Sequence, residues 1–229
     1  FDIVKRMLDQ AAEASVKTVK LQCAFAEDLS YRPLFEVGHK SKNFEIKSRP
    51  YSAEFSRLKK LELPFSFLES FVRQCESSGI SPVITAFNYA HLNSIYDCGF
   101  KAVKIASYDC GSDILIEKCG KLFERIIIST GASYDYEIEN ASKILSSLDV
   151  DLTFLHCVSI YPTPIELANL ERMNFLRKFS SKVGYSDHFG FSKNYDINLL
   201  SKIAVFLGAN TIERHFTVLS RNESKDGPV

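Results

Sequence analysis

Gly184-Tyr185-Ser186-Asp187-His188 and Ile212-Glu213-Arg214-His215-Phe216 are the two stretches that decide the fold. Each closes a short run of residues that favour β-strands, and each carries a histidine with a carboxylate side chain one or two positions before it. The two histidines are 27 residues apart (215 − 188 = 27), which is room for one strand, one helix and the next strand. The spacing therefore predicts that two imidazoles meet at the ends of neighbouring parallel strands.

His188 and His215 are consequently candidate metal ligands. Two neutral imidazoles at one edge of a sheet, with Asp187 and Glu213 beside them, suit a divalent transition metal. A single histidine of this kind more often hydrogen-bonds within its own turn, and it is the pair that favours the metal. His156 is a weaker candidate for a third ligand, because a histidine inside a strand is more typical of the core.

The composition is that of a soluble globular domain. The chain has 229 residues, 45% of them hydrophobic, and balances 28 basic against 28 acidic side chains, so neither nucleic acid nor a membrane is an expected partner. Six cysteines form no C-x-x-C pair, which indicates reduced thiols in a cytosolic protein. Because the chain starts at Phe1 and stops within a loop, we expect a fragment of a longer protein.

Seven β-prone segments alternate with helical patterns, which predicts a parallel α/β sheet. Most follow one another at roughly 20 to 30 residues, as in a (β/α)8 TIM barrel. We therefore predict that residues 1–229 are a partial barrel, strands 2 to 8, lacking the first strand and the last helix. A doubly wound open sheet is the alternative, but no glycine-rich phosphate loop follows a strand. The predicted strands are 16–22, 81–87, 101–106, 125–130, 151–156, 182–186 and 210–213.

The segment 23–63 has no sustained periodicity but carries many charges and aromatic side chains. A connection this long is usually functional or disordered, and the aromatic residues make disorder the weaker explanation. Because it follows a strand, we expect it to lie over the mouth of the barrel.

Polar side chains recur where the predicted strands end, which is where barrel enzymes place their chemistry. A lysine facing a core is costly unless it is paired, so Lys20 and Lys104 among several hydroxyls predict a phosphate or carboxylate site. The alternative is that both lysines pair with carboxylates such as Asp109 for structural reasons. The residues at these ends are Lys20, Gln22, Thr85, Lys104, Ser107, Asp109, Ser129, Thr130, His156, Ser159, Tyr161, Ser186, His188, Glu213 and His215.

Taken together, these motifs resemble the N-acetylneuraminate (sialic acid) synthase family, including its legionaminic and pseudaminic acid relatives. The resemblance covers almost the whole chain and keeps the family's order of motifs. It rests on Val19-Lys20-Leu21-Gln22, Glu62-Leu63-Pro64, Lys104-Ile105-Ala106-Ser107, Ser129-Thr130-Gly131, the run from His156 to Pro164, Gly184 to His188, and Gly208-Ala209 leading to Ile212 to Thr217.

The resemblance implies a TIM-barrel enzyme that condenses phosphoenolpyruvate with the aldehyde of an open-chain N-acyl amino sugar. The products are a 2-keto-3-deoxy (nonulosonic) sugar acid and phosphate. His188 and His215 match the ligands of Mn²⁺, with Mg²⁺ or Co²⁺ as alternatives. By the same resemblance, catalytic positions are Lys20, Lys104, Asp109, Tyr161 and Glu213, and substrate-binding positions are Gln22, Thr85, Ser107, Ser129, Ser159 and Ser186.

Several positions depart from the family pattern, and they bear mainly on the sugar. Val229 stands where many relatives have an aspartate, with Asp226 as a substitute, and Tyr108 replaces a common glycine. Thr85-Ala86-Phe87-Asn88 replaces Thr-Pro-Phe-Asp, and Ser159 replaces a frequent asparagine. The family also implies an acidic residue on the first strand, a C-terminal antifreeze-like domain and a homodimer of the full-length protein.

Two other functions fit parts of the sequence. One is another metal-dependent barrel enzyme such as an amidohydrolase, although its usual His-x-His pair is not seen. The other is a barrel that binds the sugar or phosphoenolpyruvate without catalysis.

Overall fold

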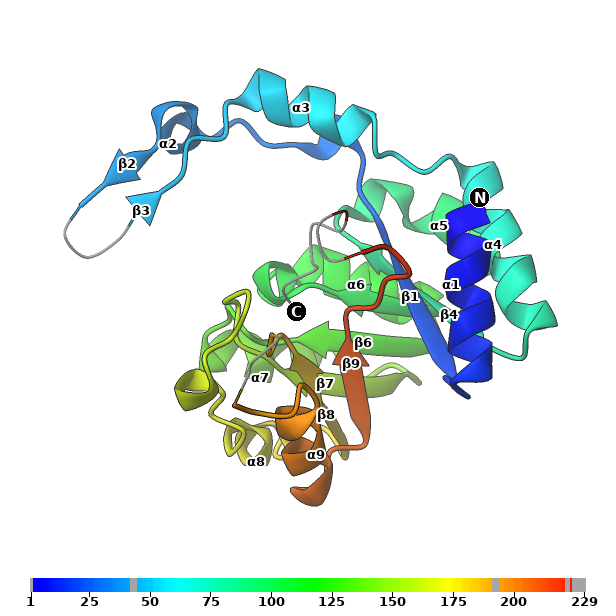
Figure 1. Cartoon of the computed structure of the whole chain (residues 1–229), viewed down its shortest axis with the longest axis vertical. Coiled ribbons are helices and arrows are strands. Elements are labelled where there is room, and N and C mark those ends of the chain that lie inside the picture. Colours follow the sequence, from blue (N-terminus) through cyan, green and yellow to red (C-terminus); the bar gives the residue numbers. More distant parts are fainter. Residues whose placement is uncertain (1, 42–44, 191–193, 221–222, 224–229) are drawn as a thin grey trace.

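A computed structural model describes residues 2–41, 45–190, 194–220 and 223. Within them, seven parallel strands pair in chain order to form one curled sheet (Figure 1). The predicted parallel α/β fold is confirmed, with strand boundaries that differ from the prediction by at most two residues. The strands are β1 Thr18–Cys23, β4 Ser81–Ala86, β5 Ala102–Ile105, β6 Arg125–Ser129, β7 Asp151–His156, β8 Lys182–Asp187 and β9 Thr211–Arg214.

One helix precedes β1, and at least one helix lies between each pair of neighbouring strands. These helices bury their apolar sides against the outer face of the sheet, as Leu68, Phe71 and Cys75 of α4 illustrate. The helices are α1 Asp2–Glu13, α4 Phe65–Ser77, α5 Leu92–Asp97, α6 Asp113–Leu122, α7 Asp135–Leu145, α8 Arg172–Leu176 and α9 Leu199–Phe206.

Three helical patterns of the sequence, at 88–97, 166–179 and 194–207, form helices over only part of their length because local side chains and backbone geometry interrupt them. In the segment 166–179 only α8 and the 3₁₀ turn Ile165–Leu167 form, since Asn169 adopts a positive φ of 41°. The segment 194–207 becomes helical only at Leu199, because Asp196 accepts a hydrogen bond from the Asn198 backbone and forms a turn. The segment 88–97 starts as a 3₁₀ turn, Tyr89–His91, before α5.

The inner face of the sheet carries one apolar layer and then a polar one. The apolar layer is formed by Val83, Ala102, Ile127 and Leu155, which cluster separately from the main core. Because side chains alternate along a strand, the next residues on the same face lie two positions further on, near the C-terminal ends of the strands. They are Thr85, Lys104, Ser129 and Cys157, with Ser186 and Glu213 on β8 and β9.

Gly184 lets β8 and β9 meet closely on this inner face. A Cβ at this position would lie 2.2 Å from the carbonyl oxygen of Thr211 and 2.7 Å from the Leu155 side chain. Backbone cannot yield as a flexible side chain does, so the glycine of the Gly184-to-His188 stretch is a packing requirement.

β1 and β9 are the two ends of the strand order. Between them lies a cavity of about 590 Å³, lined by α1, by both edge strands and by Arg125 and Leu155 from the inner face. Among the described residues, β1 is paired only with β4 and β9 only with β8.

The described residues of the long segment after β1 include several short regular elements. It contains the 3₁₀ turn η1 Ala26–Asp28, α2 Pro33–Val37, a hairpin of β2 His39–Lys40 and β3 Glu45–Ile46, and α3 Tyr51–Lys59. It leaves the sheet at the C-terminal end of β1, on the predicted side, but its hairpin stands away from the barrel instead of covering its mouth (Figure 1). No residue of α2 or α3, both fully described, is fully buried.

All six cysteines are buried and free, which confirms that they form no disulfide framework. In the part of the chain that the structure describes, no helix has the length and apolar character needed to cross a bilayer.

Candidate active site

A buried ion pair crosses the inside of the curled sheet. Lys104 near the end of β5 pairs with Glu213 of β9, although β6, β7 and β8 separate these strands in the sheet. Ser186 of β8 donates from its hydroxyl to the same carboxylate oxygen at 2.7 Å. The structure thus brings together one predicted binding and two predicted catalytic residues from three strands. Lys104 does pair with a carboxylate, but its partner is Glu213 and not Asp109.

The two lysines keep Glu213 ionised. Burial alone would raise the pKa of this carboxyl, but the charges of Lys104 and Lys20, with the hydrogen bonds from Lys104 and Ser186, lower the pKa to about 2. Lys20 and Glu213 also line the same cavity. These two ammonium groups and one carboxylate together carry a net charge of +1, which favours an anionic ligand.

His188 and His215 lie close together, as their spacing predicted. Their ring centroids are 5.6 Å apart and the rings are nearly perpendicular, at 89°. Tyr161 completes the cluster, with its ring centroid 4.1 Å from that of His188 and 6.0 Å from that of His215.

The tautomer of His188 follows from its neighbour. Its Nδ1 lies 2.9 Å from the carbonyl oxygen of Val158, which can only accept, so Nδ1 donates and the neutral ring keeps a lone pair on Nε2. Nε2 faces the interior, 3.4 Å from the Ser186 hydroxyl. Burial lowers the pKa of His188, with contributions from His215 and Lys104, so the ring stays neutral at neutral pH. A metal ligand needs this state.

The donor set fits a divalent ion held by two imidazoles, with the remaining positions left to water or substrate. No group of three or more His, Cys, Asp or Glu side chains placed to hold a metal occurs among the described residues. The expected carboxylate of Asp187 is not beside the histidines. It faces α9 on the outer side, where it accepts hydrogen bonds from Ser201 and from the backbone of Phe189. That expectation was wrong because side chains alternate along β8.

His156 is not a ligand in this arrangement. Its Nε2 lies 2.8 Å from the carbonyl oxygen of Ala168, and its ring stacks on Tyr185 on the outer, helix-covered face. This is the core role that its place inside a strand suggested.

A second polar group surrounds Ser107, after β5. Its hydroxyl accepts a hydrogen bond from the Gly131 backbone at 3.1 Å and lies 3.2 Å from Cys157 Sγ. A Cβ on Gly131 would lie 2.5 Å from that sulfur and 2.9 Å from the Ser159 hydroxyl, so only glycine fits. Ser133 donates to the Ser107 carbonyl at 3.0 Å. Three loops thus converge, and Ser133 was not among the predicted site residues.

Near the C-terminal ends of their strands, two buried hydroxyls on the inner face have no hydrogen-bond partner among the described residues, Thr85 Oγ1 on β4 and Ser129 Oγ on β6. Thr153 Oγ1 of β7, further from that end on the same face, lacks one as well. Buried hydroxyls are nearly always satisfied by protein, water or ligand. Thr85 and Ser129 were both predicted to bind substrate. On the inner face, Thr85 lies two residues after Val83 of the apolar layer, and Ser129 lies two residues after Ile127.

The remaining predicted residues lie around these groups. Gln22 is exposed at the end of β1 and lines the cavity, and Asp109 ends the short 3₁₀ turn Ser107–Asp109. Tyr108 in that turn is 79% exposed. Asp226 and Val229 lie outside the described residues.

Asp109 gives a test of the site's electrostatics. Burial raises its pKa from 3.8 to about 6, so ionisation of Asp109 costs folding free energy that grows as the pH rises above about 3.8 and is fully present above about 6. We expect Asp109→Asn to stabilise the protein by about 2 kcal/mol at pH 7, after a discount for solvent access, and to leave its stability unchanged near pH 4. Urea unfolding at the two pH values measures the difference. Equal stabilities at pH 7 would show that the carboxyl is well solvated.

Besides Ser133, two contributors were not found from the sequence. The Val158 carbonyl fixes the His188 ring, but a backbone acceptor leaves no trace in residue type. Arg214 organises the outer side of β9, and the alternation that turns Glu213 inward could have placed it there.

Comparison with known proteins places these residues in a family. Residues 7–229 match the NeuB family. The chain belongs to the NeuB family. Its relatives within NeuB include the N,N'-diacetyllegionaminic acid synthase of Campylobacter jejuni, 29% identical over 97% of this chain and 65% of the relative. The pseudaminic acid synthase of Helicobacter pylori is 27% identical over 98% of this chain and 64% of the relative.

A solved structure agrees with this NeuB assignment. The N-acetylneuraminic acid (sialic acid) synthetase of Leptospira borgpetersenii, in complex with citrate, superposes with a TM-score of 0.82 at 26% identity, over 100% of this chain and 72% of that one. The NeuB chain described here spans about two thirds of the length of the two curated relatives.

Proposed function

We propose that this chain is the barrel of a nonulosonic acid synthase. The reaction condenses phosphoenolpyruvate with the aldehyde of an open-chain N-acyl amino sugar, giving a 2-keto-3-deoxy sugar acid and phosphate. The observation that carries the proposal is the joint placement of a lysine–glutamate–serine group and two imidazoles at one edge of the sheet. Membership of the NeuB family and relatives named as sugar acid synthases support it.

Phosphoenolpyruvate fits the polar inner layer. Lys20 and Lys104 supply the positive charge for its phosphate and carboxylate, and the unpartnered hydroxyls of Thr85 and Ser129 offer hydrogen bonds that the protein itself leaves unmade. The Ser186 hydroxyl donates a hydrogen bond to Glu213, the carboxylate that pairs with Lys104, and so lies at the same site. Ser107, Ser159 and Gln22 extend the same surface.

The sugar aldehyde belongs beside the histidines. A divalent ion, Mn²⁺ above all, held by His188 and His215 supplies a Lewis acid for the aldehyde oxygen. Tyr161 lies against both rings and forms a wall for the sugar. Asp109, with a pKa of about 6, is suited to exchange a proton with the sugar near neutral pH.

The chemistry then balances as follows. The methylene carbon of phosphoenolpyruvate forms a bond to the aldehyde carbon, and the aldehyde oxygen takes a proton and becomes a hydroxyl. Water adds to the cationic carbon that carries the phosphate and releases a proton, which balances the one taken up. The C–O bond to phosphate then breaks as the new hydroxyl becomes the keto group and its proton leaves with the phosphate. Lys104 and Lys20 stabilise the departing phosphate, while Glu213, fully ionised, holds Lys104 in place instead of acting as a base.

The fold proposal goes with the function. We propose that a further strand fills the gap between β1 and β9 and closes an eight-stranded barrel, because these edges carry unpaired backbone groups and face a common cavity. An acidic side chain on that strand would reach the same interior. The antifreeze-like domain and the homodimer belong to the same proposal for the full-length protein.

The function is tested by phosphate release from the full-length protein. We expect phosphate only when phosphoenolpyruvate, an N-acyl amino sugar and Mn²⁺ are all present, and none after chelation. Binding of both substrates without turnover would favour the non-catalytic barrel. Turnover that persists in chelator would remove the metal from the proposal.

A further inference from the structure

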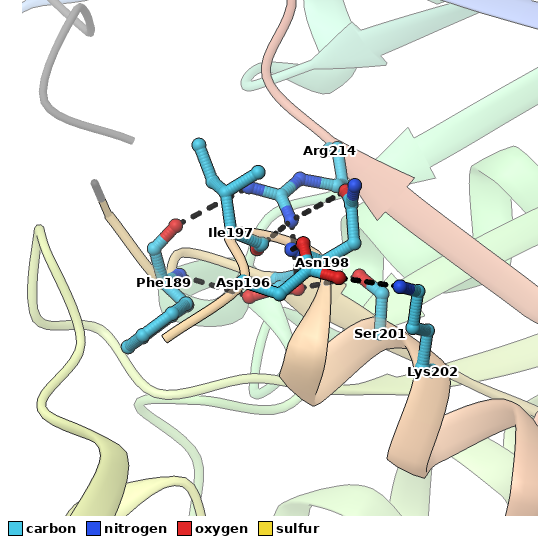
Figure 2. Close-up of polar contacts among 8 residues, drawn as sticks. Phe189, Asp196, Ile197, Asn198, Ser201, Lys202 and Arg214 are labelled. Atoms are coloured by element: carbon cyan, nitrogen blue, oxygen red, sulfur yellow. Dashed lines mark hydrogen bonds and ion pairs between the residues drawn. The ribbon is translucent and has the colours of Figure 1, made fainter. Parts of the chain in front are cut away.

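Arg214 stands in the chain between Glu213 and His215, yet its side chain serves the other face of the sheet. Its Nη1 lies 3.2 Å from Asp187 Oδ2 and donates to the carbonyl of Ile197 at 2.6 Å. Its Nη2 donates to the carbonyl of Phe189 at 3.2 Å, as Figure 2 shows. The guanidinium therefore contacts the residues on both sides of His188.

These contacts occur where the two strands stop pairing. The register of β8 and β9 ends at the pair Asp187 and Arg214, and each of these residues is followed directly by one of the histidines. Beyond that pair no strand pairing fixes the distance between the two chains. The ion pair is thus the last connection before the two imidazoles.

Asp187 is itself held rigidly. Its side chain is fully buried. Its Oδ1 accepts a hydrogen bond from the Phe189 backbone N–H at 2.9 Å, and its Oδ2, which contacts Arg214, also accepts one from the Ser201 hydroxyl of α9. Arg214 also reaches Asn198 at the start of α9. A half-buried guanidinium paired with a fully buried carboxylate and held by these added bonds has one geometry, whereas a lysine would supply a single point charge.

We propose that Arg214 is a positioning residue that sets the separation and angle of His188 and His215 through its grip on Asp187 and Phe189. This inference rests on the proposed metal site. The competing explanation is purely structural, namely that Arg214 only fastens the loop before α9.

Metal affinity separates the two explanations. In the full-length protein we would measure Mn²⁺ binding from the electron paramagnetic resonance signal of the free ion. We expect Arg214→Gln to raise the Kd for Mn²⁺ by about 10- to 100-fold, and Arg214→Lys to raise it less. Asp187→Asn should act in the same direction. Phosphoenolpyruvate affinity without metal should stay within about twofold, since Lys20 and Lys104 are untouched.

Lys202→Ala is the matched control. Lys202 lies in α9 and, among the described residues, forms its ion pair with exposed Asp196 at the edge of the same network, so its removal should leave the Kd for Mn²⁺ unchanged (Figure 2). Unchanged metal affinity in folded Arg214→Lys and Arg214→Gln, with a lower melting temperature, would overturn the inference and leave the proposed function intact. Failure of the unsubstituted protein to bind Mn²⁺ would overturn the metal site and this inference together.

Discussion

The His188→Ala variant of the full-length protein should lose condensation by at least about a thousandfold, because a Lewis acid contributes several kcal/mol to the barrier. Phosphoenolpyruvate binding should change by no more than about twofold, since Lys20, Lys104, Thr85 and Ser129, which would hold it, come from other strands. Turnover by phosphate release and phosphoenolpyruvate affinity by calorimetry measure the two effects separately. Turnover at the unsubstituted rate would end the metal hypothesis.

His156→Ala is the contrast for this experiment. That ring is equally buried but bonds to the Ala168 carbonyl on the outer face. Its loss should lower stability by about 1–3 kcal/mol while leaving the Mn²⁺ dependence intact. A His188→Ala variant that behaved like His156→Ala would identify His188 as a structural residue.

Alternation along strands explains what the sequence could predict. Once the strands were assigned by their β-prone runs, period-two alternation placed Lys20, Lys104 and Glu213 on one face and near one end of the sheet. The same rule places Asp187 on the outer face of the sheet. The expectation that Asp187 lies beside the histidines therefore conflicted with the alternation of its own strand.

Contacts between strands that are not neighbours in the sheet could not be predicted in this way. That Lys104 pairs with Glu213 and not with Asp109 depends on how far the sheet curls, which residue spacing does not encode. The helical patterns at 166–179 and 194–207 form only short helices for a related reason. Asn169 interrupts the first through its positive φ angle, and Asp196 delays the start of the second through one hydrogen bond from the Asn198 backbone. The long segment after β1 hid short elements that have no amphipathic period to detect.

Lys104→Met should have the largest effect on stability, because it leaves Glu213 buried with only the more distant charge of Lys20. Breaking one partner of a buried pair costs about 3–5 kcal/mol, and Lys20 places the expected loss near the lower end. Urea unfolding at pH 7 measures it. Lys182→Met is the control, since Lys182 forms an exposed pair with Asp151 at the opposite end of β8 and its loss should cost at most about 1 kcal/mol.

The double variant Lys104→Met/Glu213→Leu separates folding from function. Replacing both charges of a buried pair with apolar groups of similar size is often neutral, so most of the lost stability should return. Phosphoenolpyruvate affinity should not return, because Lys104 is proposed to bind phosphoenolpyruvate and the double variant lacks this lysine. Recovery of both stability and phosphoenolpyruvate affinity would show that the ion pair serves the fold and not the substrate. Recovery of stability alone assigns the buried ammonium to the substrate, and Glu213 then serves to hold that charge in the barrel while the site is empty.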